Sequence, residues 1–491
     1  MPRRAIMQLA RGDACRESRG KQIYAAFGIG MTINLVSIYI GNPYIVSLLM
    51  MLVAAVMTYK WLKQPLPWIV LVSVIAANPV NLNAPIALNL VFALFLLILN
   101  MHYLSKLPPW LYLTLFLALI SILGSVINWN TTGGIFTQFA SIANYVVGPF
   151  FLIPLIYFRL QRERDANLLL KGFVISFIVP SVTLLYLARL FGSPVINFSS
   201  GTFEYLVNVS SYHLGNVNFE LTRTQVGIPL AALICASSAV IISSVSKTIR
   251  LITIIFLIIA VFLLLVTGSV ASILASICGI TILLIVALRH NSIKRYFVII
   301  PMVIIFVFAG WSLVPQGIKD YTYSRYEIRL SGNTVENSDR NVLWQESLLF
   351  LLNNPEGRGW KLFVEPIDTY PHNDYLSYGI AFGLGCGLLY LFVPGKILFS
   401  LVAPKVRVTD PAQVTILLAG VGAVTVFLIN SFSDHLTANR WYFNIVWSMI
   451  WYAYFASKAV TSQGLEKHTF QKLGSRNSST AQISGAITRS R

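Results

Sequence analysis

Apolar stretches close to the ~20-residue length of a transmembrane helix recur from Ile23 to Ala456, and this repeat constrains the fold more than any other feature. The stretches are continuously apolar, which favours helices over the alternating pattern of membrane strands. Only 11% of the 491 residues are charged, less than half of the roughly 25% usual in soluble domains. We therefore expect an all-α polytopic membrane protein, a helical bundle of about 12–14 transmembrane helices.

The positive charges lie in short loops that alternate with uncharged loops. Five basic loops and both termini fall on one side when the spans are counted: Lys60–Lys63, Arg159–Asp165, Ser246–Arg250, Arg289–Arg295 and Pro404–Arg407. Because loops rich in Lys and Arg stay in the cytoplasm, this side is predicted to be cytoplasmic. The net charge of +18 therefore reflects membrane topology and not nucleic-acid binding. The span near Val72 is short, and a re-entrant helix is the alternative there.

The sequence predicts four parts. They are a basic cytoplasmic tail (1–22), an N-terminal transmembrane bundle (23–192), a second membrane domain (193–460) and a polar, disordered cytoplasmic tail (461–491). The second domain carries a large external loop, 315–374, which is too long for a simple connection.

A helix is predicted inside this loop, in "SDRNVLWQESLLFLLNNPEGRGW" (Ser338–Trp360). Ser338 or Asp339 can cap its start, and "NNPEG" ends it. Its apolar residues form a broad face: Trp344, Leu348, Leu351 and Leu352. We expect this helix to lie on the membrane surface or to pack over the bundle.

His372 is the leading catalytic candidate. It lies in "YPHNDYLSYG" (Tyr370–Gly379), where the external loop ends and a Gly-rich span begins. Asn373 and Asp374 follow it and are possible supporting residues. A histidine in a loop is usually just solvated, but ionisable groups at a membrane helix are costly and often functional.

Neither a metal site nor a cofactor is predicted. The histidines are dispersed, the four cysteines have no metal-ligand spacing, and no Asp-x-Asp motif occurs. A diphosphate substrate would therefore need cationic side chains. Arg223 and Arg340 are the external candidates, and Arg358 is a weaker one. The alternatives are a snorkelling Arg223, an exposed ion pair for Arg340 and a solvated charge for Arg358.

These motifs, in order, resemble the O-antigen ligase and polymerase superfamily. "PHNDYLSYGIAFGLGCGLL" is similar to its His-Asn-x-x-Leu signature, and "DRNVLWQESLLFLLNNPEGRGW" to its Arg-x-x-x-Trp helix followed by Pro-x-x-Gly-x-Gly. "TRTQVGIPLAALI" resembles its Arg-x-x-Gly segment entering a span. "VTGSVASILASICGI" resembles its Thr-x-Ser-Arg stretch, except that Val270 replaces the arginine.

The resemblance implies a membrane glycosyltransferase of the C-type fold in the bacterial inner membrane. Such an enzyme uses a glycan carried on undecaprenyl diphosphate at the periplasmic face, without metal, and transfers it to an acceptor glycolipid. By position, Arg223 and Arg340 would bind the diphosphate. His372 would activate the acceptor hydroxyl or help to hold the diphosphate.

Three functions remain open. A polymerase of O-antigen or exopolysaccharide joins one lipid-linked chain to another, whereas an O-antigen ligase transfers the chain to lipid A–core. Residues 315–374 hold six Lys and Arg against nine Asp and Glu. This balance would repel a polyanionic core and favours the polymerase. A polysaccharide transporter or flippase is the third reading, but transporters usually carry paired ionisable groups at mid-membrane, and most of the predicted spans lack charge.

Overall fold

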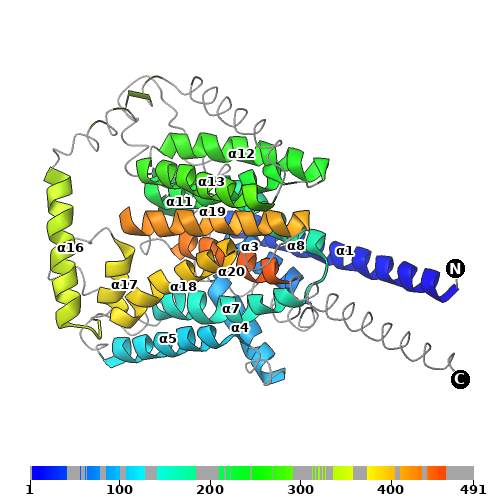
Figure 1. The fold of residues 1–491 in the computed structure, drawn as a ribbon, viewed down its shortest axis with the longest axis horizontal. Helices are drawn as coiled ribbons and strands as arrows, with labels where there is room; N and C mark the ends of the chain where they lie inside the picture. Colours follow the sequence, from blue (N-terminus) through cyan, green and yellow to red (C-terminus); the bar gives the residue numbers. More distant parts are fainter. Residues whose placement is uncertain are drawn as a thin grey trace, which may run out of the picture.

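Helices account for most of the structure, a computed structural model, and many of them run side by side (Figure 1). The residues that the structure describes are 3–40, 56, 61, 64–77, 84–99, 107–127, 141–183, 210–214, 217–221, 223–243, 246–267, 269–290, 312, 316, 319–320, 323, 327, 335–357, 373–403, 410–433 and 440–459. The fold class predicted from the apolar repeat is confirmed.

In its described residues, the N-terminal half contains six α-helices and three segments of π- or 3-10 helix. Their bounds are α1 Arg3–Ile40, α3 Pro65–Ala76, α4 Ala84–Leu99, α5 Pro109–Ile127, η3 Ala143–Leu152, α7 Ile153–Tyr157, η4 Phe158–Arg162, α8 Ala166–Phe173 and η5 Val174–Ile178. The C-terminal half contains a strand pair and the main helices of the bundle. Their bounds are β1 Ser210–Leu214, β2 Val217–Leu221, α11 Arg223–Ile242, α12 Lys247–Thr267, α13 Val270–His290, α16 Val335–Asn353, α17 Asp374–Phe382, α18 Leu384–Val402, α19 Pro411–Ser433 and α20 Arg440–Lys458.

Within the described residues, six helical stretches are long and apolar enough to cross a membrane: Ala143–Arg162, Ala166–Thr183, Lys247–Leu265, Val270–Arg289, Leu384–Val402 and Pro411–Phe432. The helix near Val72, α3, has only 12 residues, or about 18 Å at 1.5 Å per residue. That is shorter than the ~30 Å hydrocarbon core. The expected spans near Met51 and Ile304 lie outside the described residues, as does the polar tail 461–491.

The first helix is longer than the sequence analysis expected. α1 has 38 residues, so most of the predicted basic tail is helical and continuous with the first span. In Figure 1 its N-terminal part extends beyond the other helices. The segment before Ile23 contains no proline after Pro2 and several strong helix formers, which explains why the helix does not stop at the membrane boundary.

A short hairpin precedes α11 and is the one departure from an all-α chain within the described residues. β1 pairs antiparallel with β2, and Ser210 lies opposite Leu221. The dipeptide Gly-Asn separates the two strands in the sequence, which is a typical hairpin signal.

Close packing of α11, α13 and α19 forms the centre of the C-terminal half. Gly422 of α19 and Gly279 of α13 lie on either side of Cys235 in α11. A Cβ on Gly279 would stand 2.7 Å from the Cys235 Sγ, so only glycine permits this approach. Small residues that let helices approach closely are typical of membrane bundles.

The N-terminal half is joined to α17 through a proline. Pro149 lies inside the π-helical η3 and has no N–H to donate to the carbonyl of Tyr145, four residues earlier. The Tyr378 hydroxyl donates to that carbonyl at 2.9 Å. The Pro149 carbonyl in turn accepts a 2.8 Å hydrogen bond from the Trp451 indole. Two carbonyls of η3 thus attach it to α17 and α20.

Several basic segments lie together at one end of the bundle, which we call the basic end. Arg19 forms a salt bridge with Glu163 at 3.0 Å, which ties α1 to the loop after η4. Arg289 donates to the Val402 carbonyl at 3.3 Å, which joins the ends of α13 and α18. α16 crosses the opposite end, which we call the α16 end (Figure 1).

At the α16 end the predicted span around Leu388 is divided into two helices, which corrects the sequence interpretation. Gly383 has a φ of +90°, so α17 stops there and the chain reverses into α18. α17 folds back along α18, since a Cβ on Gly387 would meet the Tyr375 carbonyl oxygen at 2.9 Å. His372, Asn373 and Asp374 therefore do not begin a membrane span; they precede or begin a nine-residue helix.

α16 holds this reversal in place. The predicted loop helix is confirmed, although it starts at Val335 and not at Ser338. Leu351 of α16 is buried against Ile380 of α17. The Leu384 amide donates to the Pro355 carbonyl at 2.8 Å. The helix therefore packs over the bundle, as one of the two sequence alternatives proposed.

We predict that Gly383→Ala destabilises the protein by about 1–3 kcal/mol, since a side chain at this φ is strained. The added Cβ would also lie 2.9 Å from the carbonyl oxygens of Pro355 and Glu356. The matched control is Gly395→Ala in α18, where a Cβ meets nothing within 4 Å. Thermal denaturation in detergent measures both, and equal midpoints would contradict the proposed strain.

Candidate functional site

The start of α17 is built by Asn373, which caps the helix. Its backbone is extended (φ −149°, ψ 114°), and its side-chain Oδ1 accepts from the amides of Tyr375 at 3.0 Å and Leu376 at 3.3 Å. Asparagine is among the best residues for this position. The side chain that follows His372 in the sequence therefore has a structural function, because it fixes where α17 begins.

Asp374 is the first residue of α17, and no part of it is exposed. A buried carboxylate is costly unless donors surround it. The Tyr390 hydroxyl of α18 donates to its Oδ2 at 3.2 Å. The positive end of the α17 dipole also favours a negative charge here. Whether Asp374 supports His372, as the sequence analysis proposed, stays a prediction, because His372 lies outside the described residues.

Aromatic and hydroxyl groups link the start of α17 to the end of α19. Ser431 donates to the Tyr390 hydroxyl at 3.4 Å, and Tyr375 donates to the Leu428 carbonyl at 3.1 Å. The Tyr375 and Phe432 rings lie 4.6 Å apart. Asp374 is therefore part of a network that spans three helices.

A second network joins α13 to the same part of α19. Ser269 donates to Ser272 at 2.9 Å, and Ser272 donates to the Oδ1 of Asn430 at 3.4 Å. All three residues are buried. Asn430 and Ser431 are neighbours in α19, so the α13 network and the α17 network meet there.

Gly227 brings the start of α11 to these serines. A Cβ on Gly227 would lie 2.8 Å from both the Ser269 Cβ and the Ser272 Oγ. Gly227 stands four residues after Arg223, one position further than in the family segment that it resembles. Close contact at Gly227 places the first turn of α11, and hence the Arg223 backbone, beside the start of α13.

Three helix N-termini thus meet around the end of α19: those of α11, α13 and α17. Each N-terminus carries partial positive charge, and such ends favour anions. Val270, at the position of the arginine in the motif that this stretch resembles, is 7% exposed in the first turn of α13. An aliphatic side chain therefore packs at this position.

The predicted site residues are described to different degrees. Arg223 is the first residue of α11 and Arg340 lies in the N-terminal half of α16, but their side chains lie outside the described residues. His372 and Arg358 lie outside them entirely. In Figure 1 the N-terminal part of α16 lies toward α12 and α13, and its C-terminal part toward α17 and α18. α11 carries Arg223, α16 carries Arg340, and α17 begins two residues after His372 in the sequence. The starts of α11 and α17 and the helix α16 therefore share one end of the bundle.

Sequence reasoning missed several residues that build this site: Gly227, Ser269, Ser272, Tyr390, Asn430 and Ser431. The serines and Asn430 could have been noticed as polar residues inside apolar stretches, which must find partners in a membrane. Tyr390 gave no such signal, because a tyrosine in a span is unremarkable. Among the described residues, no group of three or more His, Cys, Asp or Glu could hold a metal ion.

The class of protein follows from this arrangement: a polytopic helical membrane protein with a polar, hydrogen-bonded site at one end of its bundle. Residues 255–392 match the family model of the O-antigen ligases, which confirms the superfamily indicated by the motifs. The match runs from α12 into α18 and includes Ser269, Arg340, His372 and Tyr390, whereas Arg223 precedes it. A comparison with curated proteins found no match.

This family supports a function in polysaccharide assembly at the membrane, by an enzyme of glycosyltransferase type. Lipid-linked glycans are the substrates that such a function implies. Ser269, Ser272, Asn373, Asp374 and Tyr390 lie within the matched segment, whereas Gly227, Asn430 and Ser431 lie outside it.

We predict that Tyr390→Phe destabilises the protein by about 1.5–3 kcal/mol, because it removes a hydrogen bond to a buried charged group. In an Asp374→Asn background the same substitution should cost less, since the charge is gone. Thermal denaturation of the four proteins in detergent gives this comparison.

Tyr452→Phe is the matched control. Tyr452 is equally buried and donates to the Leu169 carbonyl at 2.7 Å, far from Asp374 in the chain. Its effect should be the same with Asp374 or Asn at position 374. If Tyr390→Phe also costs the same in both backgrounds, Tyr390 does not stabilise the carboxylate.

Proposed function

We propose that this protein is a metal-independent, inverting glycosyltransferase that uses an undecaprenyl-diphosphate-linked oligosaccharide at the periplasmic face of the inner membrane. Its product is a polymerised surface polysaccharide, an O-antigen or an exopolysaccharide. The observation that supports this most is the meeting of three helix N-termini at the α16 end, a setting suited to a diphosphate.

The proposed reaction assigns each candidate residue a role. His372 removes the proton from the acceptor hydroxyl, whose oxygen attacks the anomeric carbon as the bond from that carbon to the diphosphate oxygen breaks. Arg223 and Arg340 stabilise the negative charge that develops on the departing lipid diphosphate. In-line attack inverts the anomeric configuration. Arg358 is a possible further contact to the diphosphate.

The buried network has a positioning function in this proposal. Asn373 sets the first turn of α17, and Asp374 anchors that turn to Tyr390. His372 immediately precedes this fixed turn, so its backbone would be held while its side chain reaches the acceptor. A base held by a rigid support is effective because proton transfer requires near-contact geometry.

An O-antigen ligase that uses lipid A–core as acceptor is the second candidate. The description of the matching family favours it, whereas the acidic balance of residues 315–374 favours the polymerase. Purified protein and a lipid-linked donor, supplied with either a second lipid-linked repeat or lipid A–core, would separate the two. We expect product with the lipid-linked repeat; product only with lipid A–core would identify a ligase. No product with either acceptor, but movement of donor across vesicles, would indicate a transporter.

We predict that His372→Ala lowers the rate of transfer about 10²–10⁴-fold, as expected for loss of a general base. Arg340→Lys should lose nearly as much activity as Arg340→Ala, because an ammonium lacks the planar fork that grips a diphosphate. Lys319→Ala is the control, since Lys319 is a partly exposed cation that donates to the Ser312 carbonyl. Initial rates of transfer with EDTA present measure all four.

Wild-type rates in His372→Ala would remove His372 from the mechanism. Loss of wild-type activity with EDTA, restored by magnesium or manganese, would contradict the proposed metal independence.

The proposal also requires a defined orientation, with both termini in the cytoplasm and the α16 end in the periplasm. Single cysteines at Gln345 in α16 and at Lys21 in α1, both exposed, would test it in a chain with Cys15 and Cys278 replaced by serine. An impermeant maleimide added to intact spheroplasts should label position 345 and not position 21. Labelling with the opposite preference would place the site in the cytoplasm and exclude the proposed donor side.

A further inference from the structure

Ser347 is a buried serine in the C-terminal half of α16. It is 0% exposed, and its Oγ has no hydrogen-bond partner among the described residues. Hydroxyls on helices commonly donate to the carbonyl four residues earlier, as those of Thr253 and Thr281 do. A buried hydroxyl without a partner is unfavourable. The surroundings of Ser347 therefore decide whether its hydroxyl is merely unpaired or serves a ligand.

Ser347 lies on the face of α16 that packs on the bundle. Leu351, one turn later, is buried on the same face and packs on α17. Glu346 and Leu348, the neighbours of Ser347 in the sequence, are exposed. Arg340 stands two turns before Ser347, so its backbone position lies on the same face of the helix. The two positions are about 10 Å apart along the helix axis, at 1.5 Å per residue.

The contacts between α16 and α17 set the level of Ser347. The C-terminal ends of the two helices meet, where the Pro355 carbonyl accepts from the Leu384 amide. One turn earlier in both helices, Leu351 lies against Gly379, where a Cβ would stand 2.5 Å from the Leu351 Cδ2. The helices therefore run in the same direction, side by side (Figure 1). A further step of four residues in both helices brings Ser347 to the level of the first turn of α17.

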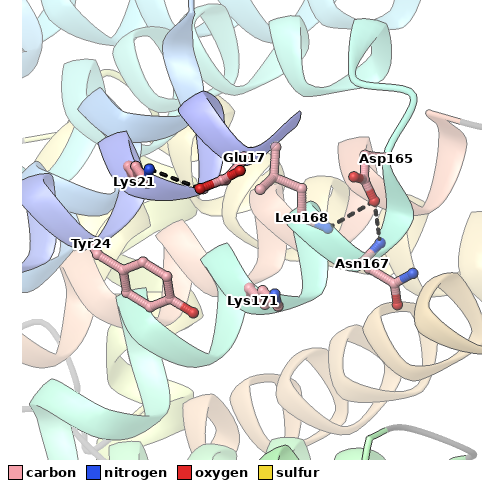
Figure 2. Close-up of a pocket in the computed structure, with 8 residues that line it drawn as sticks. Glu17, Lys21, Tyr24, Asp165, Asn167, Leu168 and Lys171 are labelled. Carbon is pink, nitrogen blue, oxygen red and sulfur yellow. Dashed lines mark hydrogen bonds and ion pairs between the residues drawn. The ribbon is translucent and has the colours of Figure 1, made fainter. Parts of the chain in front are cut away.

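Polar side chains that line a cavity of about 440 Å³ at the basic end provide a contrast (Figure 2). Lys21 binds Glu17 at 2.8 Å, although both side chains are largely exposed. Asp165 caps α8 by accepting from the amides of Asn167 and Leu168. These groups have partners within the protein where water could also serve them. The buried hydroxyl at the α16 end has none among the described residues.

We propose that Ser347 is a specificity-determining residue whose hydroxyl forms a hydrogen bond with a ring hydroxyl of the sugar attached to the diphosphate. This inference rests on the proposed function. Ser347 lies between the helix position of Arg340, the proposed diphosphate ligand, and the start of α17, which follows His372 in the sequence. The transferred sugar has to lie between the diphosphate and the base. A serine hydroxyl donates and accepts, as a sugar hydroxyl does, whereas diphosphate oxygens only accept.

The experiment compares donors with and without single ring hydroxyls on the first sugar. Wild type, Ser347→Ala and the control Ser237→Ala are purified as full-length proteins, and kcat/KM for transfer is measured with the complete lipid-linked donor and with its monodeoxy analogues. Ser237 is the matched control, because it too is 0% exposed without a partner among the described residues. It stands about 20 Å along α11 from the N-terminus of that helix, away from the candidate site. Thermal midpoints in detergent are recorded for all three proteins.

We expect Ser347→Ala to lower kcat/KM for the complete donor about tenfold, as for the loss of one hydrogen bond in the transition state. One monodeoxy donor should lose a similar factor with wild type but nothing further with Ser347→Ala, since the partner of that hydroxyl is already absent. The thermal midpoint of Ser347→Ala should not fall, because no hydrogen bond within the protein is removed. Ser237→Ala should match wild type with every donor.

Equal kcat/KM in Ser347→Ala and wild type would overturn the contact, and so would deoxy donors that lose the same factors with both proteins. A lower thermal midpoint with equal losses on all donors would show that Ser347 supports the fold and does not contact the sugar. Each of these results leaves transfer by wild type intact. Absence of transfer by wild type with any lipid-linked donor would instead contradict the proposed function, and the contact with it.

Discussion

The close crossing of Gly357 and Gly383 is the contact on which the geometry of the candidate site depends. Both residues have positive φ, and each stands where a Cβ would strike the backbone of the other segment. The crossing fixes the end of α16 against the reversal between α17 and α18. Because α17 is turned back along α18, its N-terminus lies beside Tyr390, and a carboxylate can be buried there with a donor.

This reversal explains how a polar group is placed in an apolar bundle. An uninterrupted helix from Asp374 to Val402 would carry Asp374 away from Tyr390. The reversal instead places Asp374 beside Tyr390 and Tyr375 beside the end of α19. Backbone that is not in a spanning helix is tolerated within a membrane protein only where it is buried or lines a cavity. Asn373 caps α17 and so provides a hydrogen-bond acceptor for the first backbone amides of this helix.

The sequence allowed the class of fold, the loop helix and the polar start of α17 to be predicted, because each has a local signal. Hydropathy indicates the length of the spans. Ser, Asp and Pro-Gly pairs mark the ends of helices, and positive charge marks the basic loops. The reversal at Gly383 was not predicted, because "GIAFGLGCGLL" contains several glycines and only one adopts positive φ. Gly379 and Gly387 serve close packing, as the sequence suggested for the whole segment.

The site itself was harder to predict, since its contacts join residues far apart in the chain. Tyr390 and Asp374 are 16 residues apart, but Ser272 and Asn430 are separated by 158. No local sequence signal in α19 indicates that the N-termini of three helices lie around its end. The basic end shows the same limit, because Arg19 binds Glu163, which lies 144 residues away in the sequence. Charge patterning predicted on which side of the membrane these residues lie, but it did not predict that they contact one another.

The most direct test of the account is a cryo-EM structure of the protein with a non-transferable analogue of an undecaprenyl-diphosphate-linked sugar. The account predicts that the diphosphate lies at the meeting of α11, α13 and α17, with Arg223 and Arg340 on its oxygens. His372 should then lie within one water of the acceptor position, because a base must reach its proton directly or through one water. A diphosphate bound elsewhere, or His372 remote from both arginines, would contradict the shared site.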